Sequence, residues 1–304
     1  MINFIQQNLK TSDLTQCQRI FHGRGHAYKG LEHINVDWLS PVIFITLYQA
    51  VEPEWLSQQV SFLSELEVLK GKCTSIQVQH RYQKYAPIEV FWGENIEQTI
   101  VEEHQLNYHI QLGKSQNIGL FLDMANGRKW LIDHAREKNI LNLFAYTCAF
   151  SVAGLAGDAR QVVNIDMAKA ALSRGRDNHK LNKQDLTKVK FEGVDIFKSY
   201  GRLKKYGPYD ILVCDPPSFQ KGSVNIERDY KKIIKRIPQL MKAHADVILC
   251  LNSPDLDESF LLAEVERECP ECLYQGKIAN PAVFVEAEQG KGLKVLHFKY
   301  LPSY

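Results

Sequence analysis

The stretch ILNLFAYTCAFSVAG, residues 140–154, has the pattern of a buried strand followed by a helix, and this pattern is the main indication of the fold class. Residues 140–144 are nearly all apolar, which is typical of a strand buried on both faces of a sheet. Residues 145–150 then lead into a helix that opens with small side chains at 151–154. Small residues at a helix N-terminus let a ligand approach the backbone closely. The stretch lacks the G-x-G-x-x-G pattern, so the fingerprint of dinucleotide-binding proteins is absent.

Strand-like and helix-like segments alternate through the rest of the chain. Apolar runs predict further strands at residues 161–165, 189–193, 209–214, 247–251 and 293–300, the last of them antiparallel. Helices are predicted at residues 168–180, 228–244 and 257–268. Buried strands separated by amphipathic helices imply an α/β fold with a doubly wound, mostly parallel, Rossmann-like sheet. In such sheets ligands bind beyond the carboxyl ends of the strands.

The pattern differs before residue 113. Short β-like runs occur at residues 41–48, 74–80 and 88–92, and a hairpin is predicted from 98–102 and 107–112. One helix is predicted at residues 53–69 from the spacing of its leucines and valine. We therefore expect two domains. Residues 1–112 form a smaller, β-rich α/β domain, and residues 113–304 form the larger sheet domain.

The length and amino-acid composition of the chain exclude several classes of protein. With 304 residues, 45% of them hydrophobic and 24% charged, the chain is neither disordered, a coiled coil nor a fibre. No apolar run is long enough to span a membrane. The chain shows no signal peptide, and its seven cysteines are thinly spread. These features predict a protein of the reducing cytoplasm.

Charge is unevenly distributed along the chain. Residues 1–110 carry 8 Lys or Arg and 12 Asp or Glu, whereas residues 111–242 carry 24 and 13. Residues 243–304 are acidic again, with 5 and 10. A basic middle between acidic flanks favours contact of one face with a polyanion, although solvated lysine-rich helices would give the same counts.

Acidic residues follow three successive predicted strands. Asp166 follows the second strand, where a carboxylate can accept from ribose hydroxyls or cap the next helix. Asp195 follows the third, where it can accept from an adenine amino group or act as a cap. The fourth is followed by Asp-Pro-Pro-Ser-Phe at 215–219, a stiff loop because proline fixes its own φ and restricts the residue before it. Phe219 in this loop can stack on a planar base.

Together these motifs resemble a known family. They are GLFLD at 119–123, LNLFAYT at 141–147, Asp166 and DPPSF at 215–219. The sequence is similar to the class I S-adenosylmethionine-dependent 23S rRNA methyltransferases, bacterial large-subunit enzymes that make 7-methylguanine or 5-methylcytosine. The resemblance covers about residues 88–300 and does not identify the target nucleotide.

The resemblance implies a role for individual residues. It assigns to the cofactor, S-adenosylmethionine, the residues Asp123, Arg128, Phe144, Tyr146, Thr147, Asp166, Asp195 and Asp215, and we add Met167 and Ile196, which directly follow two of the aspartates. It assigns to methyl transfer the residues Asp215 and Pro216 and the position of Asn252, and from the loop itself we add Pro217 and Phe219 as candidate catalytic residues. Two positions depart from the family: Cys148 stands where glycine is usual, and Ala125 stands where a second arginine is common.

The target atom is predicted from the loop after the fifth strand. Carbon 5 of cytosine is a poor nucleophile, so its methylation requires a cysteine thiolate that adds to the ring first. The resemblance places that cysteine at the position occupied here by Asn252. Cys214 and Cys250 are better explained as small buried residues, although a register error of two residues would reopen Cys250. Guanine N7 needs no covalent partner, so it is the preferred target, followed by an exocyclic amine.

The expected partner is 23S rRNA, either free or in an assembly intermediate. Its candidate contacts are Arg24, Lys221, Arg228, Lys231 and Lys232. We expect no metal, since neither the histidines near Arg24 nor the lone Cys269-x-x-Cys272 pair has a second ligand pair. Two rival functions remain: a methyltransferase acting on a small molecule or protein, and a non-catalytic RNA-binding protein that retains the fold.

Overall fold

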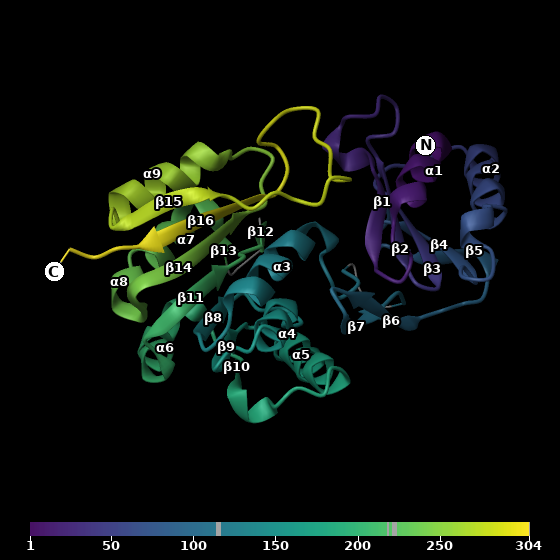
Figure 1. Cartoon of the computed structure of the whole chain (residues 1–304). Coiled ribbons are helices and arrows are strands. Elements are labelled where there is room, and N and C mark those ends of the chain that lie inside the picture. Colours follow the sequence, from purple (N-terminus) through teal and green to yellow (C-terminus); the bar gives the residue numbers. More distant parts are fainter. Residues whose placement is uncertain (114–116, 218, 221–223, 304) are drawn as a thin grey trace. The chain divides into compact units, whose positions relative to one another are not determined.

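The computed structural model describes residues 1–113, 117–217, 219–220 and 224–303, and it divides into two compact units. The first unit comprises Met1–Asp123 and Pro281–Gln289. The second comprises Met124–Asn280 and Gly290–Tyr304 (Figure 1). Within the described residues, no helix has the length and apolar character needed to cross a membrane.

A seven-stranded sheet forms the centre of the second unit. Its strands are β8 (Asn139–Leu143), β9 (Gln161–Ile165), β10 (Val189–Glu192), β11 (Tyr209–Cys214), β14 (Met241–Leu251), β15 (Cys272–Lys277) and β16 (Lys294–Tyr300). They lie in the order β10-β9-β8-β11-β14-β16-β15. The first five strands of this order are parallel to one another, and β16 is antiparallel to both of its neighbours. The predicted α/β fold with a mostly parallel sheet and a late antiparallel strand is confirmed.

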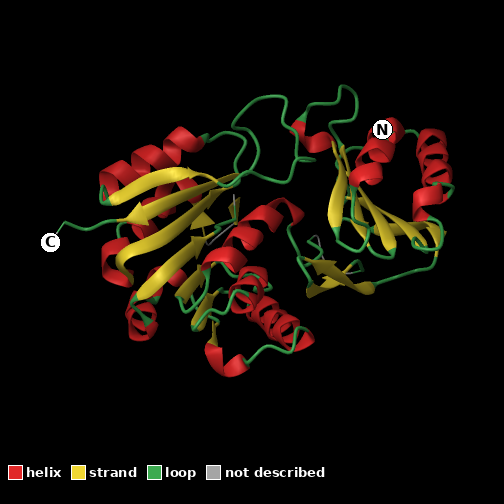
Figure 2. Cartoon of the chain, in the orientation of Figure 1, coloured by secondary structure: helices red, strands yellow, loops and turns green. Residues whose placement is uncertain are grey.

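Helices cover both faces of this sheet (Figure 2). They are α3 (Ala125–His134), α4 (Ala149–Ala156), α5 (Lys169–Leu181), α6 (Tyr200–Tyr206), α7 (Ile226–Ile234), α8 (Ile237–Leu240) and α9 (Glu258–Glu268). Side chains of each strand alternate between the faces, so Ile140 packs with α3 and α4, whereas Leu141 packs with α7 and α9. The strands β8, β9 and β11 are almost wholly buried on both faces, which explains why they are continuous apolar runs in the sequence.

Two predictions about the second unit are wrong in detail. The helix predicted at 228–244 ends earlier, because residues from Met241 onward belong to β14 and pair with β11. This pairing is supported by Lys242, whose Nζ lies 2.9 Å from both carboxylate oxygens of Asp210. The edge strand β15 is not predicted, since four of its six residues are exposed and its sequence lacks alternation. Tertiary pairing outweighs local propensity in both cases.

The first unit contains a five-stranded mixed sheet. Its elements are α1 (Ile2–Thr11), β1 (Gln18–His22), β2 (Ile34–Leu39), β3 (Val42–Leu47), α2 (Pro53–Ser64), β4 (Ser75–His80) and β5 (Ile88–Gly93). The strands lie in sequence order, and β3 and β4 are the one parallel pair, joined through α2. The predicted hairpin is present as β6 (Gln98–Glu103) and β7 (Leu106–Gln111).

A distant segment, Pro281–Gln289, packs within the first unit. The amide of Ala287 donates to the carbonyl of Gly25 at 2.7 Å, and a Cβ on Gly25 would lie 1.9 Å from the Val285 carbonyl oxygen. His22 contributes its ring, which lies 4.9 Å from the Phe284 ring. The glycine of this turn is therefore required by close chain packing, while the neighbouring Arg24 is exposed.

Candidate functional site

The carboxyl ends of five parallel strands meet at one edge of the second unit's sheet. Leu143 of β8 lies opposite Ile165 of β9 and Cys214 of β11, and the pairing continues outward to Glu192 of β10 and Leu249 of β14. Neighbouring strands in a sheet are about 4.8 Å apart. The residues that follow these strands are therefore brought together along one edge, among them Phe144, Asp166, Asp195, Asp215 and Asn252.

Asp166 connects two strand ends through its carboxylate. Oδ2 accepts from the Tyr146 amide at 2.8 Å, and Oδ1 accepts from the Ala168 amide at 2.7 Å. An ionised carboxylate has about four acceptor sites, so each oxygen retains the capacity for one more donor. The carboxylate is half-buried and its orientation is fixed by two backbone amides. This arrangement fits a pair of vicinal ribose hydroxyls.

Asp195 lies one strand further along the edge. Its Oδ1 accepts from the Phe197 amide at 2.9 Å, so the residue caps the short 3-10 helix Ile196–Lys198, as one of the two predicted readings requires. Oδ2 lies 3.7 Å from Lys198 Nζ. Ile196 is buried, whereas Met167, directly after Asp166, is 54% exposed. Apolar atoms are therefore present beside both carboxylates.

The loop between β8 and α4 has an unusual backbone. Phe144, Tyr146 and Cys148 have φ values of 59°, 48° and 60°, so every second residue is left-handed without being glycine. Such conformations store strain and cluster at functional sites. The amides of two of these residues have acceptors within the protein: the Tyr146 amide donates to Asp166 Oδ2 at 2.8 Å, and the Cys148 amide donates to the Ala145 carbonyl at 2.7 Å. Thr147, buried in this loop, is fixed by Asn178, whose Nδ2 donates to its carbonyl at 3.0 Å.

Cys148 stands where the resembled family usually has glycine, and its side chain packs against a glycine, Gly175, on the neighbouring helix α5. The Cys148 side chain is fully buried, and burial raises the pKa of its thiol. A Cβ on Gly175 of α5 would lie 2.4 Å from Cys148 Sγ and 2.8 Å from its Cβ. The thiol at position 148 therefore occupies the space that a side chain at position 175 would need.

We expect Gly175→Ala to lower the free energy of unfolding by about 1–3 kcal/mol, because it overpacks this contact. In a Cys148→Gly background, where the sulfur is absent, the same change should cost less than about 0.5 kcal/mol. Urea unfolding of the four proteins measures this coupling. Equal losses in the two backgrounds would show that the Cys148 sulfur is not the obstacle.

The loop after β11 contains Asp215, Pro216 and Pro217. Asp215 is half-buried, Pro216 is buried and Pro217 is exposed. The backbone of Phe219 then pairs with Asn225 in a small hairpin of β12 (Phe219–Gln220) and β13 (Val224–Asn225). The Phe219 side chain lies outside the described part of the chain, so its predicted stacking role stays a prediction.

Tyr230, on α7, is a site residue that the sequence reasoning missed. Its buried hydroxyl lies 2.9 Å from the Cys250 carbonyl oxygen and 3.2 Å from the Cys214 carbonyl oxygen. These carbonyls precede Asp215 and Asn252 on the neighbouring strands β11 and β14. Tyr230 therefore holds together the two strand ends that carry the predicted methyl-transfer residues. The helical spacing of Ile226, Tyr230 and Ile233 in the sequence is the signal that indicates its burial.

Lys294 anchors the loop that contains Asn252. This β16 side chain is fully buried, and its Nζ donates to the Ser253 carbonyl at 2.5 Å and to the Gly290 carbonyl at 2.9 Å. Asn252 itself is exposed. A buried ammonium group thus fixes the backbone directly beside an exposed amide at the candidate site.

Cys214 and Cys250 are both fully buried. Burial, together with the charge of Asp215, raises the pKa of the Cys214 thiol far above its usual range. Thiolate formation is required for nucleophilic attack. Cys214 in its present environment is therefore unsuited to covalent catalysis, and Cys250 is shielded from any base bound at the edge.

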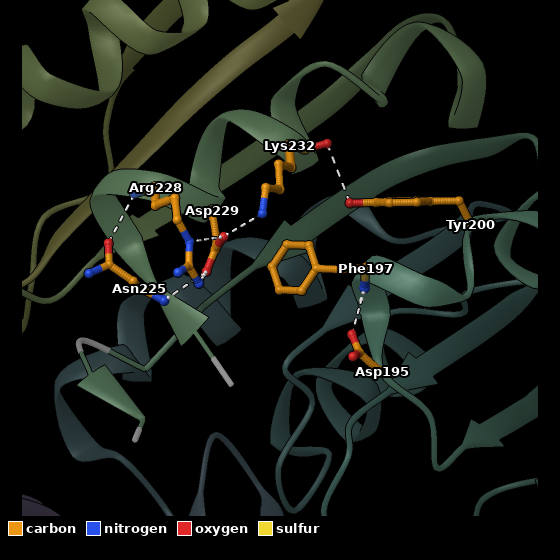
Figure 3. A network of polar contacts seen from close by, with 7 residues as sticks. All are labelled: Asp195, Phe197, Tyr200, Asn225, Arg228, Asp229 and Lys232. Carbon is orange, nitrogen blue, oxygen red and sulfur yellow. Dashed lines mark hydrogen bonds and ion pairs between the residues drawn. The ribbon is translucent and has the colours of Figure 1, made fainter. Parts of the chain in front are cut away.

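Three of the predicted RNA contacts lie on α7, and Figure 3 shows two of them, Arg228 and Lys232. Arg228 donates to the buried carboxylate of Asp229 at 2.8 and 2.9 Å, and Lys232 Nζ donates to it at 2.7 Å. These interactions keep the pKa of Asp229 well below its usual range. Two cations around one carboxylate leave a net positive charge, and Lys231 is exposed on the same helix. RNA contact by α7 stays a prediction.

The same helix contacts the segment that follows β10 (Figure 3). Lys232 Nζ lies 5.6 Å from the centroid of the Phe197 ring, and the Tyr200 hydroxyl donates to the Lys232 carbonyl at 3.3 Å. Asp195, Phe197 and Tyr200 are thus linked to the helix that begins directly after the β12–β13 hairpin. The α7 helix therefore contacts both the segment after β10 and, through Tyr230, the ends of β11 and β14.

A buried polar network joins α4, α5 and β9 next to the β8–α4 loop. Nδ1 of His179 lies 2.6 Å from Gln184 Oε1, and Nε2 lies 2.9 Å from Ser151 Oγ. Because Gln184 Nε2 donates to the Val152 carbonyl, its oxygen accepts the Nδ1 proton, and the imidazole is neutral. Ser151 Oγ in turn accepts from Asn164 Nδ2 at 2.9 Å. Burial lowers the pKa of His179 to about 4.

This network predicts an acid-sensitive fold. The unfolded chain protonates His179 near pH 6.5, whereas the folded protein does so near 4, so the unfolded state binds more protons between these values. The contribution is fully present above pH 6.5 and falls by about 3 kcal/mol as the pH is lowered to 4. Urea unfolding at pH 7, 5.5 and 4.5 measures it. His179→Gln should flatten the dependence, and an unchanged slope in that variant would contradict the assignment.

Three further predicted residues lie outside the loops that follow the strands, and one of them, Arg128, has its Cζ 6.0 Å from the centroid of the Phe150 ring at the start of α4. Asp123 belongs to the 3-10 helix Leu122–Met124 at the end of the first unit, and Arg128 is buried on α3 of the second unit. Arg24 lies in the first unit, and Lys221 lies outside the described residues. Among the residues that the structure describes, no three His, Cys, Asp or Glu side chains are grouped so that they could hold a metal ion.

The sheet order and the residues at its carboxyl edge define a Rossmann-like methyltransferase fold. The protein belongs to the S-adenosylmethionine-dependent methyltransferase family, whose model matches residues 18–299. The crystal structure of SMU.776, provisionally named a methyltransferase and complexed with SAH, has a similar fold with a TM-score of 0.83. The sequences are 23% identical, and the match covers 98% of this chain and 81% of that one.

Two curated relatives are similar in sequence. The ribosomal RNA large subunit methyltransferase I of Tolumonas auensis is 33% identical over 45% of this chain and 36% of its own length. The provisionally named ribosomal RNA large subunit methyltransferase YwbD of Bacillus subtilis is 26% identical over 79% of this chain and 61% of its own. The chain thus spans between about a third and three fifths of the length of these relatives. The predicted cofactor, S-adenosylmethionine, is confirmed for the family.

Proposed function

We propose that this protein transfers a methyl group from S-adenosylmethionine to guanine N7 in large-subunit rRNA. The convergence of Asp166, Asp195 and the Asp215–Pro216–Pro217 loop on one sheet edge carries the proposal. The names of the relatives from Tolumonas auensis and Bacillus subtilis support rRNA as the substrate class. Such an enzyme acts in the cytoplasm, where rRNA is made.

The residues at the edge fit the cofactor. Asp166 retains acceptor capacity for two ribose hydroxyls, and Asp195 does so for an adenine amino group. The loop around Tyr146 and Cys148, which Asp166 holds through the Tyr146 amide, is the candidate position for the methionine part of the cofactor. When bound, S-adenosylmethionine supplies an electrophilic methyl group. The protein's part is to fix its ribose, adenine and carboxylate at neighbouring strand ends.

Among the residues that the structure describes, no accessible thiol lies at this edge, which supports guanine N7 as the acceptor atom. Cytosine C5 requires a thiolate, but Cys214 and Cys250 are buried and position 252 is asparagine. Guanine N7 has an in-plane lone pair and needs only to be held in line with the methyl group. The exposed Asn252 amide can donate to guanine O6, and the base reaches the edge after extrusion from its stack.

Nucleoside mass spectrometry tests the proposal. 23S rRNA from a strain lacking the gene should contain less 7-methylguanosine than rRNA from its parent, and the purified protein should restore it in vitro. Loss of 5-methylcytidine instead would retain the rRNA substrate and overturn the choice of atom. Identical modification profiles, with no methyl incorporation into either rRNA, would overturn the rRNA substrate.

A matched pair of variants tests the choice of atom independently. Cys250→Ala and Cys214→Ala should retain methyl transfer within about threefold, since neither thiol reaches the base in this account. Asn252→Ala should reduce transfer to RNA without weakening cofactor binding. A Cys250 variant that is inactive although it binds the cofactor normally would favour cytosine as the target.

A further inference from the structure

Aromatic and basic side chains gather at one edge of the first unit's sheet. Leu47 at the end of β3 lies opposite His80 at the end of the parallel strand β4. Tyr48 therefore emerges beside the loop that follows β4. The members of this tyrosine–arginine surface are Arg24, Tyr48, Arg81, Tyr82, Lys84 and Tyr85.

The cations of this surface lie against aromatic rings. Cζ of Arg24 is 4.6 Å from the centroid of the Tyr48 ring, and Cζ of Arg81 is 5.5 Å from the same centroid. Nζ of Lys84 is 4.9 Å from the Tyr85 centroid. Arg81 also donates to Asn117 Oδ1 at 3.4 Å. Stacked on rings, the two guanidinium groups are held in defined positions at the surface.

These three cations lack a carboxylate partner within the described part of the chain. The contrast with α7 is clear, because Arg228 and Lys232 both pair with Asp229. Glu89, on the neighbouring strand β5, pairs with His80 at 3.2 Å. Residues 1–110 are acidic as a whole, so this edge is a local positive feature that remains available to an anion.

Tyr85 is held in a conformation that packing does not explain. Its side chain is 87% exposed, and it has a φ of 69°, followed by Ala86 at 48°. The turn is fixed by hydrogen bonds from the Gln83 amide to the His80 carbonyl at 3.0 Å and from the Ala86 amide to the Gln83 carbonyl at 3.1 Å. A large ring displayed on a strained, ordered turn indicates a binding role.

We propose that the tyrosine–arginine surface binds a single-stranded segment of the RNA substrate. The inference rests on the proposed function, since it names the surface that this enzyme uses to hold its substrate. Tyr85 and Tyr82 stack on unpaired bases, while Arg24, Arg81 and Lys84 bind the adjoining phosphates. An acidic peptide would use the cations alone and would leave the exposed rings uncovered, so RNA fits the whole surface better.

Two sets of variants test the surface. Arg24→Gln with Arg81→Gln removes two phosphate contacts, and Lys10→Gln with Lys70→Gln is the matched control on exposed lysines of the same unit. Tyr85→Gly removes the ring and also relieves the left-handed backbone, whereas Tyr85→Phe keeps the stacking face. The probes are an unmethylated 23S rRNA transcript and a 20-nucleotide single strand, with binding measured by fluorescence anisotropy at several salt concentrations.

We expect the arginine pair variant to bind RNA about tenfold more weakly and to reduce the slope of log K against log salt by about 1.5. Tyr85→Gly should weaken binding about five- to twentyfold with unchanged or higher thermal stability, and Tyr85→Phe should bind like the wild type. Cofactor affinity, measured by calorimetry, should be unchanged in all of them, because Asp166 and Asp195 lie in the second unit.

The outcomes separate this inference from the proposed function. If the wild type methylates 23S rRNA but the variants bind both probes normally, the surface assignment is overturned and the function stands. If the wild type methylates no rRNA, the proposed function is overturned, and with it the assignment of this surface to the enzyme's RNA substrate. If polyglutamate displaces the RNA as well as an unlabelled strand of equal charge does, and Tyr85→Gly has no effect, the surface binds an acidic protein instead.

Discussion

Asp166→Ala is expected to weaken the binding of S-adenosylmethionine by about a hundredfold or more. The two free acceptor sites of this carboxylate fit the ribose hydroxyls, and a hydrogen bond to a charged group contributes about 1.5–3 kcal/mol. The change also removes the acceptor of the Tyr146 and Ala168 amides, at 2.8 and 2.7 Å, which orients the loop after β8. Isothermal titration calorimetry with S-adenosylmethionine and with SAH measures the loss.

Asp177→Ala is the matched control, since this exposed aspartate lies on α5 and pairs with Lys180 at 3.1 Å. It should leave the affinity within about twofold, as expected for an exposed ion pair. Asp166→Asn keeps one acceptor oxygen and should lie between the wild type and the alanine variant. If Asp166→Ala binds the cofactor like the control does, the ribose assignment is wrong.

Tyr230→Phe is expected to reduce kcat about tenfold, equivalent to about 1.4 kcal/mol, while KM for S-adenosylmethionine changes less than about threefold. The hydroxyl is the donor shared by the carbonyls of Cys214 and Cys250, which precede the two residues assigned to methyl transfer. Its loss should also lower the free energy of unfolding by about 1–3 kcal/mol. Methyl-transfer kinetics and urea unfolding give both values.

Tyr200→Phe serves as the control for this change. The Tyr200 hydroxyl also donates to a backbone carbonyl, that of Lys232, but this carbonyl belongs to α7 and not to a strand end. The control should lose less activity than Tyr230→Phe at a similar loss of stability. If both variants lose activity in proportion to stability, Tyr230 has only a structural role and does not position Asp215 and Asn252.

The sequence predicted the edge of the sheet correctly because one rule connects local pattern to position. Parallel strands end at the same edge, so residues that follow buried strands, such as Asp166, Asp195 and Asp215, converge without any knowledge of side-chain contacts. The fold class followed from the same strands. The strands predicted to end at residues 144, 165 and 214 end at 143, 165 and 214 in the structure, which was sufficient to locate the candidate site.

The parts that sequence reasoning missed depend on contacts between distant residues. Tyr230 and Lys294 contact the site from α7 and β16, and a local pattern reports only that such residues are helical or alternate in a strand. The packing of Pro281–Gln289 against the turn at Gly25 joins residues more than 250 positions apart. The short helix α8 and the early start of β14 depend on pairing with β11, which no local propensity encodes.

A crystal structure of the protein with SAH would show where the cofactor binds on the sheet. We expect both ribose hydroxyls to lie within about 3.2 Å of the Asp166 carboxylate, with the adenine against Ile196 and its amino group directed at Asp195. The sulfur should face the Asp215–Pro216–Pro217 loop. SAH bound at another face of the sheet, without contact to Asp166, would contradict the account.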